Sequence, residues 1–412
     1  MKRFFSMIML LSVFTYVQLF AQKNPYSSAD KETQKVLKKV DKLIQKGQYQ
    51  TAFGSLGADT NEYIIAKKIE LCSKYFALSM MHTMFAFKNL EKGETLYDVR
   101  HEVSTAGEIT LTSVLYDPAE VVKGFIEANG EKPILDYALG LYYDDVIYRY
   151  SGNWIMSDEE IMNNALTYLR KAYDQDCYDG FSLSTLAFIY FSMNDIENAK
   201  MVFDTKEQEG YKFTADDDYN YSIILWDFGD LKKALKYSER CIKGYSDNPE
   251  YQCDAYIITT RIALSVPDYK KAESMLKKCE AKYPDDYRIP LYRITLYALQ
   301  GNKQKTLNSA DVFFAISPEN PEISQMIIEN FEKAGVWSWL PEFFETNLVR
   351  YTDNLSAKQN LLIHYAYTLY RLEDYERAAQ AVAQAKEELV KDDSLSPEIE
   401  KFLDRILETK NQ

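Results

Sequence analysis

Apolar and polar positions alternate along most of this chain with the period of amphipathic helices. Ala234, Tyr237 and Cys241, for example, are spaced three and four residues apart, which places them on one face of a helix. Short polar turns such as Gly229-Asp230 separate these apolar segments. The pattern therefore predicts a succession of short helices, and the fold class is all-α.

The turns return at a nearly constant distance along the chain. Each turn precedes a small or apolar anchor residue, and successive anchors are 34 to 38 positions apart. The anchors are Ala165, Ala199, Ala234, Ala272, Thr306, Leu340 and Ala378. Pro284 and Pro318 show the same spacing of 34 independently. A repeat of this length is typical of an array of helix pairs.

Small residues occupy two further fixed places in the repeat. The first helix of a pair carries one about twelve positions before the anchor: Ala187, Ser222, Thr260 and Ala366. The second helix carries another seven positions after the anchor: Ala172, Cys241, Cys279 and Ala385. Small side chains let helix backbones approach closely, and stacking successive pairs buries a continuous core. Cys241 and Cys279 are accordingly interpreted as packing residues.

This pattern resembles the tetratricopeptide repeat (TPR) family. The resemblance is carried by the period, the Leu139-Gly140-Leu141-Tyr142-Tyr143 run, the Gly229-Asp230-Leu231 and Glu373-Asp374-Tyr375 turns, the anchor alanines, and Pro284 and Pro318. It covers roughly residues 133–390. Thr306 departs from the anchor alanine, and Leu340-Pro341 interrupts the sixth copy. The resemblance implies an α-solenoid of stacked helix-turn-helix repeats.

The predicted organisation has four parts. Residues 1–22 form a signal peptide, 23–130 irregular N-terminal helical repeats, 131–390 the TPR-like array, and 391–412 a C-terminal capping helix. In the second part, residues 35–52 look like one more helix pair and 62–87 like an apolar helical stretch. Residues 109–116 are rich enough in β-branched residues for a strand, but with no evident partner strand they are interpreted as an irregular helix.

The first 22 residues have the pattern of a secretory signal. Lys2 and Arg3 precede an uncharged, mostly apolar run from Phe4 to Phe20, and cleavage is expected after Ala21. The alternative is an uncleaved membrane anchor. No Cys follows the run to accept a lipid, and no later segment is apolar enough to cross a bilayer. The expected location is periplasmic, envelope-associated or extracellular.

Composition argues against several classes of function. The formal charge of −14 disfavours a nucleic-acid partner. Three scattered His and five widely spaced Cys match no metal site or disulfide framework. Residues 174–180 resemble a calcium loop, but the acids and the glycine are out of register, so an inter-repeat turn is expected. We expect no metal, no cofactor, no catalytic residue and no enzyme activity.

In the resembled family, the first helices of the repeats line a concave groove that holds a peptide or a partner helix. The corresponding positions here are rich in aromatic residues and Arg, which are enriched at interface centres. They are Phe188, Phe191, Tyr219, Trp226, Asp227, Arg261, Tyr367, Tyr370 and Arg371. The same residues could instead fill the packing between repeats.

The leading hypothesis is an exported scaffold that binds a protein or peptide partner without catalysis. Two alternatives remain open. One is a carbohydrate-binding protein of an envelope uptake system, for which 33 Tyr would provide stacking surfaces. The other is a sensor or adaptor module of a signalling complex.

Overall fold

The computed structural model describes residues 23–106 and 111–408. The predicted signal peptide, residues 1–22, lies outside these ranges. The chain divides into two compact units, Met1–Phe213 and Thr214–Gln412. This division lies inside the predicted array, because residues 131–213 group with the N-terminal part.

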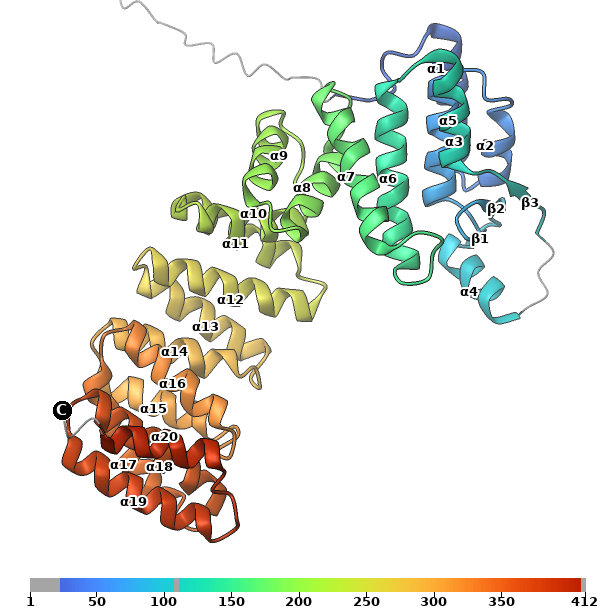
Figure 1. The fold of residues 1–412 in the computed structure, drawn as a ribbon. Coiled ribbons are helices and arrows are strands. Elements are labelled where there is room, and N and C mark those ends of the chain that lie inside the picture. The colour runs from blue at the N-terminus through green and yellow to red at the C-terminus, as the bar shows by residue number, and fades with distance from the viewer. Residues whose placement is uncertain (1–22, 107–110, 409–412) are drawn as a thin grey trace, which may run out of the picture. The chain divides into compact units, whose positions relative to one another are not determined.

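The first unit combines helices with one small sheet (Figure 1). Its elements are α1 (Lys31–Gln45), α2 (Tyr49–Ser55), α3 (Glu62–Lys74), β1 (Leu78–Met80), β2 (Met84–Ala86), α4 (Leu96–Ala106), β3 (Ser113–Leu115), α5 (Pro118–Asn129), α6 (Pro133–Tyr150), α7 (Asp158–Asp174), α8 (Gly180–Ser192) and α9 (Ile196–Gln208). Consecutive helices pack as pairs: α1 with α2, α6 with α7, and α8 with α9. The pair predicted over residues 35–52 is therefore confirmed.

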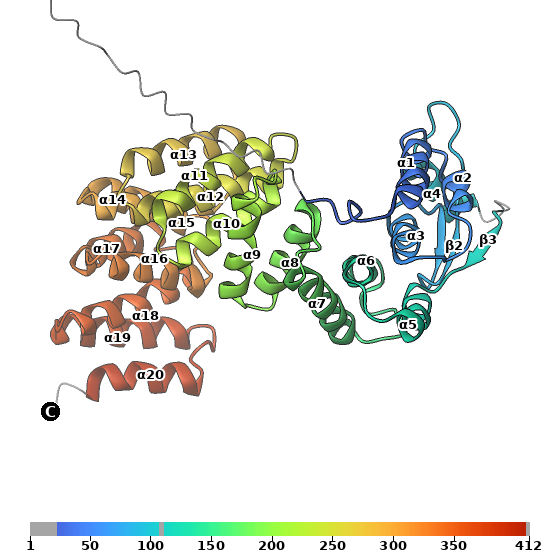
Figure 2. The same cartoon turned by 90° about the horizontal axis from the view of Figure 1, so that it is seen from above.

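The second unit is helical throughout its described residues. Its elements are α10 (Ala215–Asp227), α11 (Leu231–Gly244), α12 (Pro249–Ser265), α13 (Tyr269–Lys282), α14 (Arg288–Leu299), α15 (Lys303–Phe314), α16 (Pro321–Lys333), the 3₁₀ turn η1 (Trp337–Trp339), α17 (Leu340–Arg350), α18 (Leu355–Arg371), α19 (Tyr375–Val390) and α20 (Pro397–Glu408). Figure 2 shows α18, α19 and α20 following one another at the C-terminal end of this unit. Leu340-Pro341 does not end the array, because η1 connects α16 to α17 and Pro341 lies in the first turn of α17.

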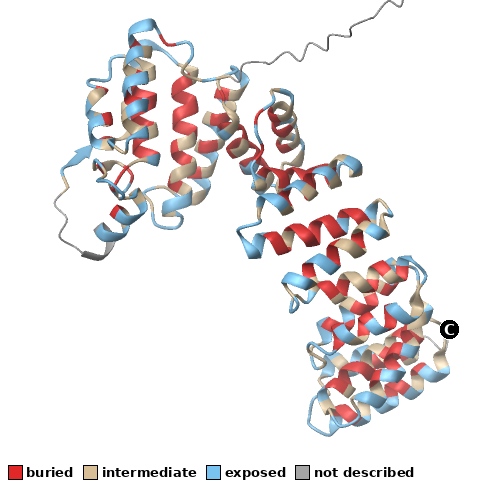
Figure 3. Cartoon of the chain, turned by 180° about the vertical axis from the view of Figure 1, so that it is seen from behind, coloured by how far each residue is buried: buried red, intermediate tan, exposed pale blue. Residues whose placement is uncertain are grey.

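The anchor residues occupy the tightest places in the helix pairs. All seven anchors, from Ala165 to Ala378, lie on second helices and are at most 1% exposed. The small residues of the first helices, such as Ala187 and Thr260, are also fully buried. Buried residues follow the helix faces where neighbours meet (Figure 3). The stacked-pair interpretation is confirmed by this burial.

The polar turns both redirect the chain and cap the second helices. The side chain of Asp230 accepts a hydrogen bond from the backbone N–H of Lys233, and Asp268 does the same for Lys271. Asp195, Asn302 and Asp374 cap their helices in the same way. Gly229, just before one cap, has a φ of 75°, which glycine adopts without strain.

The segment predicted as helical between residues 62 and 87 is only partly helical. Helix α3 ends at Lys74, and a hairpin of β1 and β2 follows, with Met80 opposite Met84. The irregular helix predicted over residues 109–116 is wrong for its described part, because Ser113–Leu115 forms β3. Its partner is β2, where Met84 pairs with Leu115, about thirty residues away. Residues 107–110 lie outside the described residues.

One hydrophobic cluster extends through the C-terminal part of the second unit. It runs from Leu291 in α14 to Ile406 in α20 and includes the fully buried Phe344 of α17. Helix α20 packs on α18 and α19 and begins with Pro397, as expected for a capping helix. The cluster makes the last helices one continuous core.

Candidate functional site

The nine predicted groove residues all lie on first helices of pairs. Phe188 and Phe191 are on α8 in the first unit, and the other seven are on α10, α12 and α18 in the second. None of the nine is buried, and Phe188 is 52% exposed. Their side chains are thus accessible, while their role in binding stays a prediction.

Three residues of α10 and α12 form the first of two aromatic–arginine clusters, the Trp226 cluster. The guanidinium of Arg261 lies over the indole of Trp226, with 4.6 Å between the guanidinium carbon and the ring centroid. The indole Nε1–H donates to Oγ of Ser265 at 3.0 Å, and that hydroxyl donates to the backbone carbonyl of Arg261. Arg261 is exposed, and no carboxylate of the described residues forms an ion pair with its guanidinium, so its N–H donors remain available to a ligand.

The second cluster, the Arg371 cluster, joins η1 to the first helices α16 and α18. Arg371 lies over the ring of Trp337 at 4.9 Å, and its Nη1 donates to the Tyr367 hydroxyl at 2.9 Å. Its Nη2 also contacts Glu332 on α16 at 3.1 Å. Arg371 is therefore already paired with an anion, unlike Arg261.

The remaining predicted groove residues are not drawn into these clusters. Tyr370 makes an edge contact with Tyr375 of α19, with ring centroids 6.1 Å apart. Tyr219 is half-buried, and burial raises the pKa of its hydroxyl. Asp227 is exposed at the end of α10. Tyr219 and Tyr370 therefore take part in packing as well as facing solvent.

A cavity of about 80 Å³ lies between α3 and α6 in the first unit, a feature that the sequence analysis missed. Carboxylates and aromatic rings share its lining, and Lys74 contributes a cation. The lining includes Tyr26, Glu70, Lys74, Asp144, Asp145 and Phe181. Two adjacent acids inside the apolar α6 segment, Tyr143-Asp144-Asp145-Val146, were the available sequence signal.

Two of the three carboxylates at this cavity have partners within the chain. Glu70 accepts hydrogen bonds from Nζ of Lys67 at 2.7 Å and from the Tyr26 hydroxyl at 3.1 Å. Burial would raise the pKa of Glu70, but the charges of Lys67 and Lys74 and these hydrogen bonds hold it below its usual value. Asp145 Oδ2 lies 2.8 Å from both His82 Nε2 and Arg149 Nε.

Asp144 is different, since no described residue gives it a hydrogen bond or an ion pair. Burial, together with the neighbouring charge of Asp145, raises the pKa of Asp144 to about 6. A carboxyl group that is partly removed from water and lacks a partner is less favourable when ionised. Such groups are concentrated at functional sites more often than in structural cores.

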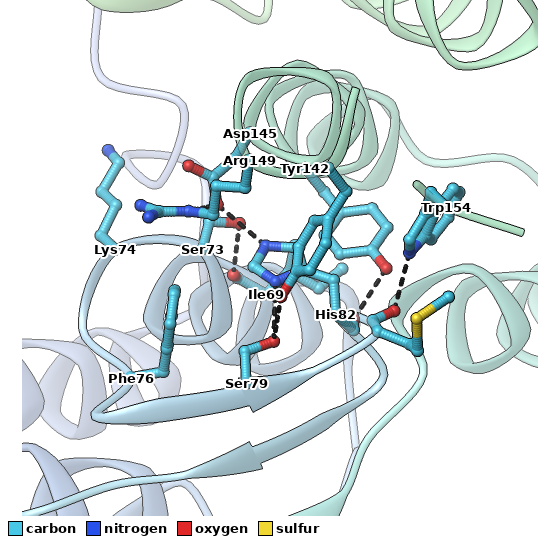
Figure 4. Close-up of polar contacts among 12 residues, drawn as sticks. Ile69, Ser73, Lys74, Phe76, Ser79, His82, Tyr142, Asp145, Arg149 and Trp154 are labelled. Carbon is cyan, nitrogen blue, oxygen red and sulfur yellow. Dashed lines mark hydrogen bonds and ion pairs between the residues drawn. The ribbon is translucent and has the colours of Figure 1, made fainter. Parts of the chain in front are cut away.

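A polar network beside the cavity ties the β1–β2 hairpin to α6 (Figure 4). His82, fully buried in the hairpin turn, contacts Asp145 of α6 through Nε2 and Ser79 of β1 through Nδ1, at 2.8 and 3.0 Å. Tyr142 donates to the backbone carbonyl of His82 at 2.8 Å. Burial lowers the pKa of His82 despite its bond to Asp145, so the imidazole is neutral at pH 7.

A hydroxyl, an imidazole and a carboxylate are linked in that order by the contacts of Ser79, His82 and Asp145. This is the order of groups in a Ser-His-Asp catalytic triad. The hydroxyl of Ser79 also accepts a hydrogen bond from Tyr150 at 3.0 Å. Ser79 does not line the cavity, and His82 is 0% exposed. With φ of 53° at His82, the network holds a tight turn in place. We interpret it as support for α6 and Asp145.

The cysteines behave as packing residues. Cys241 and Cys279 are both 0% exposed at the small-residue position of their helices. Sγ of Cys253 lies 3.5 Å from Sγ of Cys279, and all five cysteines are free thiols. Residues 174–180 form a turn in which Asp179 caps α8, as expected.

Comparison with known proteins finds similarity to solved structures of tetratricopeptide repeat proteins. No protein-family model and no curated protein matches it. Among solved structures, YrrB, described as a TPR protein with an unusual peptide-binding site, is 18% identical, with 52% of this chain and 99% of that chain covered and a TM-score of 0.41. A tetratricopeptide repeat protein from Parabacteroides merdae is 15% identical, with 67% and 99% covered and a TM-score of 0.41. Yeast Tom70 is 13% identical, with 91% and 82% covered and a TM-score of 0.31.

All three structures are less than 20% identical to the chain and have TM-scores below 0.5, so the fold is argued from the chain itself. The chain's own helix pairs, capped turns and buried anchors make it an all-α solenoid of TPR-like repeats. In the part of the chain that the structure describes, no helix has the length and apolar character needed to span a bilayer.

Replacing Asp144 with Asn is expected to stabilise the first unit at pH 7 by about 1–2 kcal/mol. Because the folded-state pKa is raised to about 6 from 3.8, the folded protein holds more protons than the unfolded chain between these values. The free energy of unfolding therefore falls as pH rises through this window. An Asn at position 144 cannot ionise, so the variant does not lose this stability. Urea unfolding at about pH 3.5 and pH 7 measures the effect, with Glu127→Gln on the exposed side of α5 as control. An equal change at both pH values would contradict the prediction.

Proposed function

We propose that this protein is a non-catalytic scaffold that holds a peptide segment of a partner protein against the first helices of its repeats. The solenoid of TPR-like pairs supports this proposal, since such arrays present first helices along one surface. The partner is a protein, and catalysis is no part of the role.

The observation that carries the proposal is the Trp226 cluster. The guanidinium of Arg261 lies over the indole of Trp226, and the Trp226 Nε1–H bond to Ser265 fixes the ring. A large aromatic surface beside an Arg that is held in one geometry loses little entropy on binding. Trp and Arg of this kind are the residues that most often dominate binding energy.

The unpaired donors of Arg261 define which peptide groups would bind there. A stacked guanidinium presents its N–H groups along its edge, where they match carboxylate or carbonyl oxygens. We therefore propose that the peptide supplies an acidic side chain or a backbone carbonyl to Arg261 and an apolar side chain to Trp226. At the Arg371 cluster, Tyr367 and Trp337 offer a second aromatic surface.

We also propose that the protein works outside the cytoplasm. The basic start and apolar run of residues 1–22 support export, with a periplasmic, envelope-associated or extracellular destination. Its partner would then be another envelope or secreted protein.

An array of random fifteen-residue peptides probed with the mature chain tests the scaffold function. We expect a set of peptides that bind the wild type and lose about tenfold or more in affinity with Trp226→Ala or Arg261→Ala. Arg261→Lys keeps the charge but loses the planar guanidinium over the indole, and should also weaken binding. Lys232→Ala, an exposed change on the second helix α11, is the control.

Binding that is unchanged in both alanine variants would exclude the Trp226 cluster as the site. An absence of peptide binding, combined with binding to glycan arrays, would favour the carbohydrate-binding alternative. Circular dichroism of each variant shows that it remains folded.

A further inference from the structure

We propose that the cavity between α3 and α6 binds the side chain of a lysine on the partner protein. This inference rests on the proposed peptide-binding function for the source of the lysine. It concerns the first unit, and none of the predicted groove residues lines this cavity.

The aromatic walls of the cavity already hold ammonium groups of the chain itself. Nζ of Lys74 lies 4.8 Å from the centroid of the Phe181 ring, and Nζ of Lys67 lies 4.4 Å from that of Tyr26. Lys67 also contacts the carboxylates of Glu70 and Asp41, at 2.7 and 3.1 Å. An aromatic ring with adjacent carboxylates thus forms a working ammonium site beside the cavity.

Asp144 supplies the negative charge that an incoming ammonium requires. Glu70 and Asp145 are already paired with Lys67 and Arg149, whereas Asp144 has no described partner. An ammonium group placed next to Asp144 would compensate an ionised carboxylate that is partly buried. This compensation favours a cationic occupant over a neutral one.

The size and opening of the cavity favour lysine over larger cations. A cavity of about 80 Å³ has room for an ammonium and the last methylene groups of its side chain, since about 10–15 Å³ of such space already holds a water. A compact ammonium also suits one free carboxyl group, whereas a guanidinium prefers a two-pronged partner. Phe181, 53% exposed, and Lys74, also exposed, mark the side from which the lysine would enter.

Binding of the lysine should weaken when Asp144 is protonated. The charged and titratable groups that line the cavity with it are Asp145 and Tyr137 on its own helix, Glu70 and Lys74 on α3, and Tyr26 from the N-terminal segment. A cation would therefore compete with the proton at Asp144, so affinity should fall as pH decreases through about 6.

The test uses lysine-containing peptides that bind the wild type in the random array. Each peptide is resynthesised with norleucine, acetyl-lysine or arginine in place of its lysine, and affinities are measured by fluorescence anisotropy. The variants are Asp144→Asn and, as matched control, Asp136→Asn. Asp136 lies on the same helix and burial likewise raises its pKa to about 6, but it does not line the cavity.

We expect the norleucine and acetyl-lysine peptides to bind the wild type about tenfold or more weakly, because they lack the ammonium charge that pairs with Asp144. Arginine should weaken it less. Asp144→Asn should abolish the preference for lysine, while Asp136→Asn should keep it. Equal affinities for lysine and norleucine, or a lysine preference that survives in Asp144→Asn, would overturn the inference.

The outcomes separate this inference from the proposed function. If peptides bind through Trp226 without any dependence on lysine, the scaffold function stands and the lysine site is wrong. If no peptide binds, both fail. A last experiment titrates the protein with n-butylammonium. If this amine binds and the binding depends on Asp144, while no peptide depends on its lysine, the cavity binds a free amine. The proposal that a lysine of the partner occupies it would then be wrong.

Discussion

Replacing Phe344 with Ala is expected to destabilise the second unit by about 3–5 kcal/mol, the range for a large aromatic side chain removed from a core. Phe344 is 0% exposed within the hydrophobic cluster of the last helices. Its ring centroid lies 5.2 Å from that of Phe343 and 5.9 Å from that of Tyr365. Alanine would remove the ring contacts with α18 and leave a void that close-packed neighbours fill only in part.

The midpoint and slope of urea unfolding, followed by circular dichroism, measure this loss. Val349→Ala is the matched control, because Val349 lies on the same helix and is 79% exposed. It should change stability by less than about 0.5 kcal/mol. A Phe344→Ala protein as stable as the control would mean that the cluster is not the core of the second unit.

Gly140→Ala is expected to destabilise the first unit by about 2–3 kcal/mol through overpacking. A Cβ on Gly140 would lie 2.5 Å from Cγ of Leu169 and 2.8 Å from its backbone nitrogen. The backbone atom of α7 cannot move without displacing the helix. The clash therefore outweighs the helix propensity that alanine adds, about 1 kcal/mol.

Gly124→Ala on α5 separates the two effects. It also replaces a helical glycine, but its Cβ would meet nothing within 4 Å. This change should stabilise the protein by about 0.5–1 kcal/mol. Thermal unfolding of both variants gives the comparison, and destabilisation of similar size in both would show that close approach of α6 and α7 is not the cause.

Gly140 also matters for the candidate site, because α6 carries Asp144 and Asp145. The close contact of α6 with α7 and the His82 network hold this helix from two sides. If Gly140→Ala shifts α6, the lysine preference proposed for the cavity should weaken along with stability.

Much of the fold could be predicted because its signals are local. The turn residue Gly229, the cap Asp230 and the anchor Ala234 lie within six residues of one another. Similar residues recur at these positions in the other repeats. The same register placed Trp226 and Arg261 one repeat apart on successive first helices, and the structure brings them to 4.6 Å. The repeat period thus placed both residues on first helices, but it did not predict the contact between them.

The features that were missed depend on segments far apart in sequence. Strand β3 pairs with β2 through Met84 and Leu115, and no periodicity within Ser113–Leu115 indicates that partner. His82 and Asp145 are separated by 63 positions, yet they are 2.8 Å apart. Pairings of this kind arise from how helices and loops pack in three dimensions.

The sequence by itself determined that this protein is a solenoid of helix pairs, because helix period, capping and small-residue spacing are properties of short segments. Only the tertiary structure decided that a small sheet interrupts the N-terminal repeats and that a cavity opens between α3 and α6. It also decided that Asp144 lacks a partner while Asp145 has two. The pKa and pairing of a carboxyl group depend on its surroundings in space, and those are set by packing between distant segments.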